Sequence, residues 1–468
     1  MNRIIPLILA VALFMENMDS TVIATSLPAI ATDIGTSPVA LKLALTAYLV
    51  SLAIFIPISS WMADKHGAKR VFRIAIAVFV IGSIGCAAAN ALGGFVLARF
   101  VQGIGGAMMT PVARLVLVRS TPKRELVSAM AWLTMPALIG PMLGPPVGGF
   151  ITTFFSWHWI FIINVPIGVL GIWLAGRFLP EIPSAGAGPI DLPGFFLSAI
   201  AASGIVFGLS VVSLPALPPA FGVAAVLVGI AAAIFYVRHS RRRSHPLLNL
   251  RLFANPVFRA AVIGGLVFRV GIGAVPFLLP LLFQLGFGMS PFQSGMLTFA
   301  SAMGAFAMKL LAPIMLRLGG FRTILIASGL LSAGLIAVNG FFTPATSAGV
   351  IILVLLVAGF FRSLFFTSTN ALVFADIESA DASQATAISA VSQQISIALG
   401  VAVGGTTLEA AAYFSGQAIG PSAFTTAFLV IAFISMLAVI PFIGLAPTAG
   451  NSVSGHRLSD PEEPRAPL

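Results

Sequence analysis

Stretches of about 20 predominantly apolar residues recur along almost the whole chain. A helix of that length crosses a hydrocarbon layer of roughly 30 Å, inside which only helices and closed barrels satisfy their own backbone groups. A barrel would show alternating apolar and polar residues, and this chain does not. Hydrophobic residues make up 58% of the sequence and charged residues 8%, which is more apolar surface than a soluble core could bury. We therefore predict an all-α integral membrane protein.

The apolar stretches divide into about 14 predicted transmembrane helices. The first group is expected at Ile4–Ala24, Ala40–Met62, Val71–Asn90, Phe95–Val118, Val127–Thr153 and Trp157–Phe178. The second group is expected at Leu192–Ser213, Ala220–Val237, Val257–Phe283, Phe292–Leu316, Thr323–Phe342, Ser347–Ala375, Gln384–Ala412 and Thr425–Ala446.

Basic residues gather in the connections after the second, fourth, eighth and tenth predicted helices. They are Lys65, Lys69, Arg70, Arg73, Arg119, Lys123, Arg124, Arg238, Arg241, Arg242, Arg243, Arg251, Arg317 and Arg322. Because cytoplasmic connections carry such an excess, we expect a multi-pass protein of a bacterial-type inner (cell) membrane with both termini in the cytoplasm. The same topology accounts for the formal charge of +11, so no nucleic-acid partner is indicated.

Two short motifs recur in the two ends of the chain. ADKHGAKR at 63–70 and LRLGGFR at 316–322 share a basic-x-Gly-x-x-Arg frame, and GPPVGG at 144–149 is answered by GVAVGG at 400–405. These frames predict a six-helix bundle over 1–178, linkers and two additional helices over 179–250, and a second six-helix bundle over 251–447. A disordered cytoplasmic tail is expected over 448–468. Such repeats place a substrate site between the halves, near the middle of the membrane.

Signatures of enzymes and metal sites are missing from the sequence. It contains no G-x-S-x-G, H-E-x-x-H or P-loop motif, its five histidines are scattered, and Cys86 is its single cysteine. We expect no catalytic residue, no metal and no cofactor. The energy for transport must then come from an ion gradient or from the gradient of the substrate itself.

Two acids lie three residues apart in the first predicted helix, so Glu16 and Asp19 share a helix face. Each ionised acid near the membrane centre costs about 2.5–3.5 kcal/mol. The pair must therefore face a watery cavity, meet a cation or hold a proton. We predict that both acids couple transport to protons. The alternative is a polar patch that only holds the first helix against its neighbours.

Small and polar residues share one face of the fourth predicted helix, where Arg99, Gln102, Gly103 and Gly106 follow one another at three- and four-residue steps. The glycines permit close helix packing and Arg99 points inward. We assign Gln102 to substrate binding.

The fifth predicted helix combines prolines, which remove helix hydrogen bonds, with glycines, which allow close packing. We assign a gating role to Gly140, Pro141, Gly144, Pro145, Gly148 and Gly149. Packing without a role in transport is the alternative.

The second half carries cations within its predicted helices, namely Arg269, Lys309 and Arg362. They predict an anionic substrate or one that carries a carboxylate, with Asn370 as a further hydrogen-bonding group. The alternative is internal salt bridges to the acids Glu16, Asp19 and Glu409.

Several of these segments, in this order, resemble the signature motifs of the major facilitator superfamily, in its 14-spanning drug:proton antiporter branch of EmrB/QacA type. They are MDSTVIATSLP at 18–28, ADKHGAKR at 63–70, RFVQGIGGAMM at 99–109, GPMLGPPVGGF at 140–150 and SWHWIFIINVPIG at 156–168. The chain departs from the usual pattern at Ser60 and Ala24, where relatives have glycine and asparagine, and Glu16 lies outside it.

The resemblance implies that Arg99 helps to relay the proton; the alternative for Arg99 is a structural salt bridge. It also implies that Asp64, in a motif with Gly67, Lys69 and Arg70, contacts the start of a helix in the other half, near Gln384. A carboxylate at a helix start gains only about 0.3–1 kcal/mol, so such a latch can break and reform.

These observations favour a proton-coupled antiporter of the multidrug-efflux type that exports small amphipathic or anionic compounds by alternating access. Its partners would be a small-molecule substrate, protons and the lipid bilayer, and no sequence feature indicates a periplasmic adaptor. One alternative is an uncoupled or differently coupled transporter of organic acids or metal chelates. A more remote alternative is a membrane sensor that does not transport.

Overall fold

The computed structural model describes residues 4–122, 125–182, 189–212, 217–244, 246–378, 381–416 and 419–451. All regular secondary structure in these ranges is helical, as predicted. Twelve helices among the described residues are long and apolar enough to cross a membrane. The predicted spans at Val127–Thr153 and Phe292–Leu316 are helical as well, in α6 and in the first part of α12.

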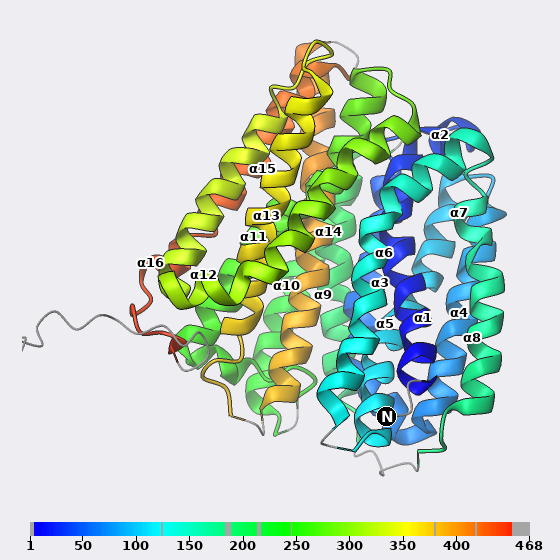
Figure 1. Ribbon diagram of the computed structural model, residues 1–468, viewed down its shortest axis with the longest axis vertical. Coiled ribbons are helices and arrows are strands. Elements are labelled where there is room, and N and C mark those ends of the chain that lie inside the picture. Colours follow the sequence, from blue (N-terminus) through cyan, green and yellow to red (C-terminus); the bar gives the residue numbers. More distant parts are fainter. Residues whose placement is uncertain are drawn as a thin grey trace, which may run out of the picture.

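The first group of helices runs from the N-terminus to residue 178. It consists of α1 (Ile4–Val22), the 3-10 turn η1 (Ile23–Ser26), α2 (Leu27–Asp33), α3 (Lys42–His66), α4 (Ala68–Ala87), α5 (Leu92–Ser120), α6 (Leu126–Phe154), α7 (Trp159–Ile162) and α8 (Asn164–Phe178). These helices lie together on one side of the molecule (Figure 1). The N-terminus and α2 lie at opposite ends of this bundle (Figure 1), which we call the N-terminal end and the α2 end.

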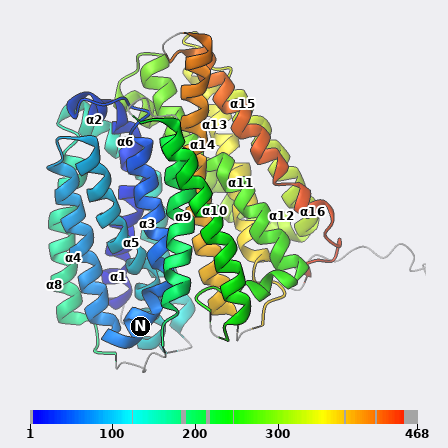
Figure 2. The ribbon, with the colours of Figure 1, turned by 180° about the vertical axis from the view of Figure 1, so that it is seen from behind.

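The second group lies on the other side of the molecule (Figure 1). It consists of the 3-10 turn η3 (Leu250–Ala254), α11 (Pro256–Leu281), the π-helical turn η4 (Leu282–Gly286), α12 (Pro291–Asn339), α13 (Ala348–Leu372), α14 (Ala382–Ser415), α15 (Pro421–Leu437) and α16 (Ile440–Ile443). The pair α9 (Leu192–Val211) and α10 (Pro219–Arg242) lies between the two groups (Figure 2). There α9 contacts both α3 and α14.

Helix α12 contains two of the predicted spans, because the chain is helical up to Gly320 and again directly after it. Gly320 has φ 64° and ψ 168°, a backbone conformation that a residue without a side chain adopts easily. The chain therefore turns sharply there without a long loop.

Helix starts in the second group follow ordinary capping chemistry. Asn255 accepts hydrogen bonds from the backbone N–H groups of Val257 and Phe258 at the start of α11. Ser290 and Gln293 form a reciprocal capping box at the start of α12. Each cap satisfies backbone donors that have no partner within the helix, and so fixes where the helix begins.

Candidate transport site

A cavity of about 260 Å³ lies between the two groups of helices, lined by α1, η1, α3, α5, α11 and α14. Its polar lining comes mainly from α1 and α14, with Glu16, Asn17, Ser20, Thr21, Gln393 and Gln394. Leucines of α3 and Phe277 of α11 supply apolar wall. The cavity therefore presents a polar strip and an apolar wall to any molecule inside it.

A buried polar cluster lies behind one wall of this cavity, around the fully buried carboxylate of Asp19. Arg99 Nη1 lies 2.6 Å from Asp19 Oδ2. Gln102 Nε2 and Asn164 Nδ2 donate to Asp19 Oδ1 at 2.9 and 2.8 Å. Both amides also donate to Ser83 Oγ, at 2.7 and 3.2 Å. Helices α1, α4, α5 and α8 each contribute to this cluster, so one carboxylate ties four helices together.

Arg99 connects the cluster to the cavity, because it pairs with Asp19 and also lines the cavity. Its guanidinium lies over the ring of Tyr48, 4.3 Å from the ring centroid. A cation over an aromatic face is stabilised by the ring quadrupole. Arg99 Nε has no hydrogen-bond partner among the described residues, which leaves one donor available beside the cavity.

Glu16 occupies a different environment from Asp19, although both belong to α1. Its carboxylate lines the cavity and accepts a hydrogen bond from Thr110 Oγ1 at 2.7 Å. Arg114, whose side chain is exposed on α5, also attracts it. The two acids therefore divide into one that faces the cavity and one that is enclosed and paired with a cation.

The predicted substrate-binding residues do not assemble around this cavity. Gln102 belongs to the Asp19 cluster. Arg269 is buried in α11, donates to Asn370 Oδ1 at 2.8 Å and lies over the ring of Phe366. Lys309 is exposed on α12, and Arg362 lines a separate small cavity.

Sequence reasoning missed several polar residues of the site. Gln393 and Gln394 are a pair of adjacent amides within a predicted span, and Asn164 is the only amide in SWHWIFIINVPIG. Polar groups isolated in apolar helices are costly in a membrane and therefore mark functional positions. That signal could have identified these three residues.

The two groups of helices are joined at the α2 end by polar and close contacts. The ammonium of Lys42, at the start of α3, pairs with Glu409 of α14. Gln284 Nε2 donates to the carbonyl of Thr25 at 2.9 Å. A side chain at Gly149 of α6 would overlap the backbone of Pro291 in α12. These contacts join the two groups of helices at the α2 end.

The other predicted gating glycines of α6 pack on α1. A side chain at Gly144 would meet Thr21, and one at Gly148 would meet the carbonyl of Val22. The fit is looser at Gly140, where a side chain would begin 3.0 Å from the backbone nitrogen of Met18. Pro141 and Pro145 are half-buried within this helix, which stays helical from Leu126 to Phe154.

The predicted latch residues at the N-terminal end have other partners in this structure. Asp64 accepts from Arg119 Nη2 at 2.8 Å, and Lys69 lies 3.1 Å from Glu181. Gln384 accepts from the backbone N–H of Asn249 at 3.0 Å. Gly67 has φ 84°, which explains a glycine there, and Arg70 is exposed. A contact between Asp64 and the start of α14 stays a prediction.

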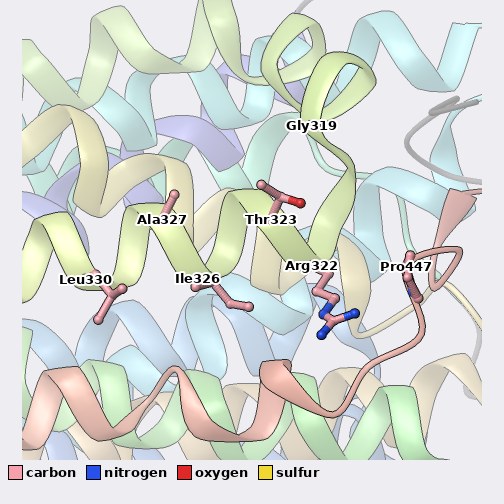
Figure 3. Close-up of a pocket in the computed structure, with 7 residues that line it drawn as sticks. All are labelled: Gly319, Arg322, Thr323, Ile326, Ala327, Leu330 and Pro447. Atoms are coloured by element: carbon pink, nitrogen blue, oxygen red, sulfur yellow. The ribbon is translucent and has the colours of Figure 1, made fainter. Parts of the chain in front are cut away.

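A larger cavity, of about 500 Å³, lies at the edge of the second group (Figure 3). It is formed by Gly319 and the helix that follows it, on one side, and by Pro447 on the other (Figure 3). Its lining includes the exposed Leu330 and comes from the second group only. A site that alternates between the two sides of a membrane must lie between the halves, so the smaller central cavity is the better candidate.

Comparison with known proteins supplies the family context of this geometry. The sequence profile of the Major Facilitator Superfamily matches residues 9–401. HsrA of Haemophilus influenzae, named as a transport protein, is 38% identical over 421 residues, which cover 90% of this chain and 91% of HsrA. MdtD of Salmonella paratyphi B, named as a multidrug resistance protein, is 35% identical over 404 residues, which cover 86% and 85% of the two chains.

Solved transporter structures share the fold at low sequence identity. A D-xylose-proton symporter superposes with a TM-score of 0.67 and 16% identity, over 96% of this chain and 98% of its own. The transporter PepTSo of the POT family gives a TM-score of 0.70 and 14% identity, over 95% and 97%.

Proposed function

Because the chain belongs to the Major Facilitator Superfamily and is a membrane transporter, not an enzyme, we propose that its central cavity exports small amphipathic compounds in exchange for protons. The observation that carries this proposal is the position of Glu16 in the cavity, with the Asp19–Arg99 pair directly behind it. The name of the relative MdtD supports drug-like substrates. The two groups of helices are proposed as the halves that alternate, with α9 and α10 as the inserted pair.

Protons and substrate compete for the charge of Glu16 in this mechanism. An ionised carboxylate attracts the polar or cationic end of a substrate, and a proton that neutralises it weakens this attraction. Arg99 couples the charge in the cavity to Asp19. A change in charge near Arg99 Nε, which has no hydrogen-bond partner among the described residues, alters the strength of the ion pair between Arg99 and Asp19. The charged groups that act on Glu16 are Arg114 and Asp19.

The lining of the cavity argues against a preference for anions. The cations of the second half that suggested an anionic substrate lie elsewhere, and Arg99 is already neutralised by Asp19. Glu16 is the acid that lines the cavity. We therefore propose neutral or cationic amphipathic substrates whose apolar part lies against Phe277 and the leucines of α3.

The direction of export follows from the proposed orientation. The basic connections lie at the N-terminal end, which the positive-inside rule assigns to the cytoplasm together with both termini. The α2 end would then face outward, and the contacts that join the two groups there support a conformation closed to the outside. Substrate would enter from the cytoplasm and leave after the α2 end opens.

Purified protein in proteoliposomes tests the proposal directly. Efflux of a fluorescent cationic dye should accelerate when the side that receives the dye is made more acidic. Glu16→Gln and Asp19→Asn should each reduce this acceleration by at least tenfold, since each removes a carboxylate from the pathway. Asp33→Asn is the matched control, because Asp33 is an exposed acid beyond the cavity.

Efflux that ignores the imposed pH gradient would exclude proton coupling. In that case the uncoupled transporter of organic acids or metal chelates becomes the better hypothesis. Gradient-driven efflux that both acid variants retain would instead place coupling at other residues.

A further inference from the structure

Arg362, near the middle of α13, lines a second enclosed space inside the second group of helices. This cavity measures about 20 Å³ and is also lined by Ser301, Ser332 and Asn339 of α12. A single water molecule needs a cavity volume of about 10–15 Å³. The cavity therefore has room for one water molecule or one ion of similar size, and it is too small for an organic substrate. It is thus distinct from the central cavity, with which it shares no lining residue.

Two of the polar side chains around this small cavity are almost completely buried. Ser332 and Asn339 are only 2% and 1% exposed, and neither Ser332 Oγ nor Asn339 Oδ1 has a hydrogen-bond partner among the described residues. Over the same residues Arg362 forms no ion pair. Buried polar atoms are nearly always satisfied, so this arrangement points to a bound particle.

No acid of this part of the protein can neutralise Arg362. The sequence contains no aspartate or glutamate between Asp191 and Asp376. Asp376 follows Arg362 by roughly 20 Å along a helix axis, at about 1.5 Å per residue. Glu409 of α14 is paired with Lys42. The guanidinium is therefore a half-buried cation in an apolar bundle with neutral neighbours.

We propose that this cavity binds one small inorganic anion of the size of chloride, held by the Arg362 guanidinium, the Ser332 hydroxyl and the Asn339 amide. A water molecule would satisfy the hydrogen bonds, but it would leave the positive charge uncompensated in a low dielectric. The two ends of the Asn339 amide are interchangeable by a flip, after which Nδ2 donates into the cavity. The anion is structural: it stabilises the second half and does not travel with the substrate.

Thermal unfolding of the purified full chain tests the site. The melting temperature is measured while sodium gluconate is replaced by sodium chloride at constant ionic strength and pH. Since a ligand stabilises the state that binds it, the wild-type protein should gain stability with chloride until the site saturates. Arg362→Gln should lose this response and, in gluconate, should be at least as stable as the wild type.

Two further variants separate the site from general salt effects. Arg269→Gln removes a buried cation from the same half at a place that does not line the small cavity, and it should keep the full response to chloride. Ser332→Ala removes one donor and should raise the apparent Kd for chloride about three- to tenfold. Because Ser332→Ala is a small change, it tests the site even if Arg362→Gln does not fold.

Bromide provides a direct view of the same site in the wild-type protein. Crystals grown in bromide should show an anomalous peak between Arg362 and Ser332. A melting temperature that is equal in chloride and gluconate, with no bromide peak, would mean that the cavity holds water only. An equal response to chloride in all variants would also overturn the proposal.

Discussion

Asp191 holds together the start of α9, the end of α10 and the segment that follows α10. It accepts hydrogen bonds from His239 Nε2 at 2.7 Å and from the backbone N–H groups of Gly194 and Leu247 at 3.2 and 3.1 Å. Burial by itself would raise the pKa of this carboxyl, but the hydrogen bonds and the nearby His239 outweigh it and hold the pKa below its ordinary value.

This lowered pKa predicts a pH dependence of stability. A depressed carboxyl pKa contributes stability above the ordinary value of about 3.9, and the contribution is lost as the pH falls through the lowered value. Asp191→Asn should therefore lower the free energy of unfolding by about 1–3 kcal/mol near pH 7, and the difference should shrink below about pH 4. Thermal unfolding of both proteins between pH 3 and pH 8 measures it. A difference that grows on acidification would contradict this account.

Some individual residues of the candidate site were predictable from the sequence. Asp19, Arg99 and Glu16 are conspicuous as charges in apolar helices, and the structure brings these three together around the cavity. Their partners were not predictable in the same way, because which of many small polar residues faces inward depends on the rotation of each helix. Arg269 and Arg362 were predicted to bind substrate because the sequence shows a cation in an apolar helix but does not show which cavity that cation faces.

At the scale of elements, α6 is held between α1 on one side and α12 on the other. Its glycines bring it so close that Val22 of α1 and Pro291 of α12 leave no room for a side chain at Gly148 or Gly149. Close backbone approach of this kind is what small residues permit in membrane helices. The helix can therefore transmit a displacement between the two groups.

Substitution of Gly148 by alanine tests this role of α6. The new methyl group would overlap the carbonyl of Val22, so α1 and α6 must separate. We expect a loss of about 1–3 kcal/mol in stability and a several-fold slower efflux. Gly334→Ala is the matched control in α12, because nothing lies within 4 Å of its added atom. Equal behaviour of the two variants in unfolding and efflux assays would argue against tight packing at α6.

The number and the placement of the helices were largely predictable, since apolar length alone determines a membrane span. The predicted spans correspond to helices of the structure. The break at Gly320 was expected as a connection between Leu316 and Thr323, but the structure makes it without a loop. The register between α6 and α12 was not predictable, because it depends on contacts between helices that are far apart in the sequence.

At the scale of the whole molecule, the ion pair between Lys42 and Glu409 joins the two groups of helices at the α2 end. Lys42 is fully buried, so separating it from Glu409 removes a close opposite charge from a cation that lies out of water. The pair is therefore suited to hold the α2 end closed until the cavity is ready to open there.

Exchange of the two charges tests this closure. In a Cys86→Ser background, a cysteine at Ala24 reports access to the cavity from the α2 end through its reaction with a membrane-impermeant thiol reagent. Lys42→Glu places two acids together and should raise the labelling rate at least threefold. The double variant Lys42→Glu with Glu409→Lys should restore slow labelling. Fast labelling of the double variant would show that the pair does not control access.

The Asp19 cluster draws every one of its hydrogen-bonding groups from α1, α4, α5 and α8. If the two groups of helices move as rigid bodies, this entire network moves with the first group. None of its bonds then has to be remade during a transport cycle. Only the contacts between the two groups of helices would then change during reorientation. A change in the opposite group would affect Asp19 only through Arg99, which lines the cavity.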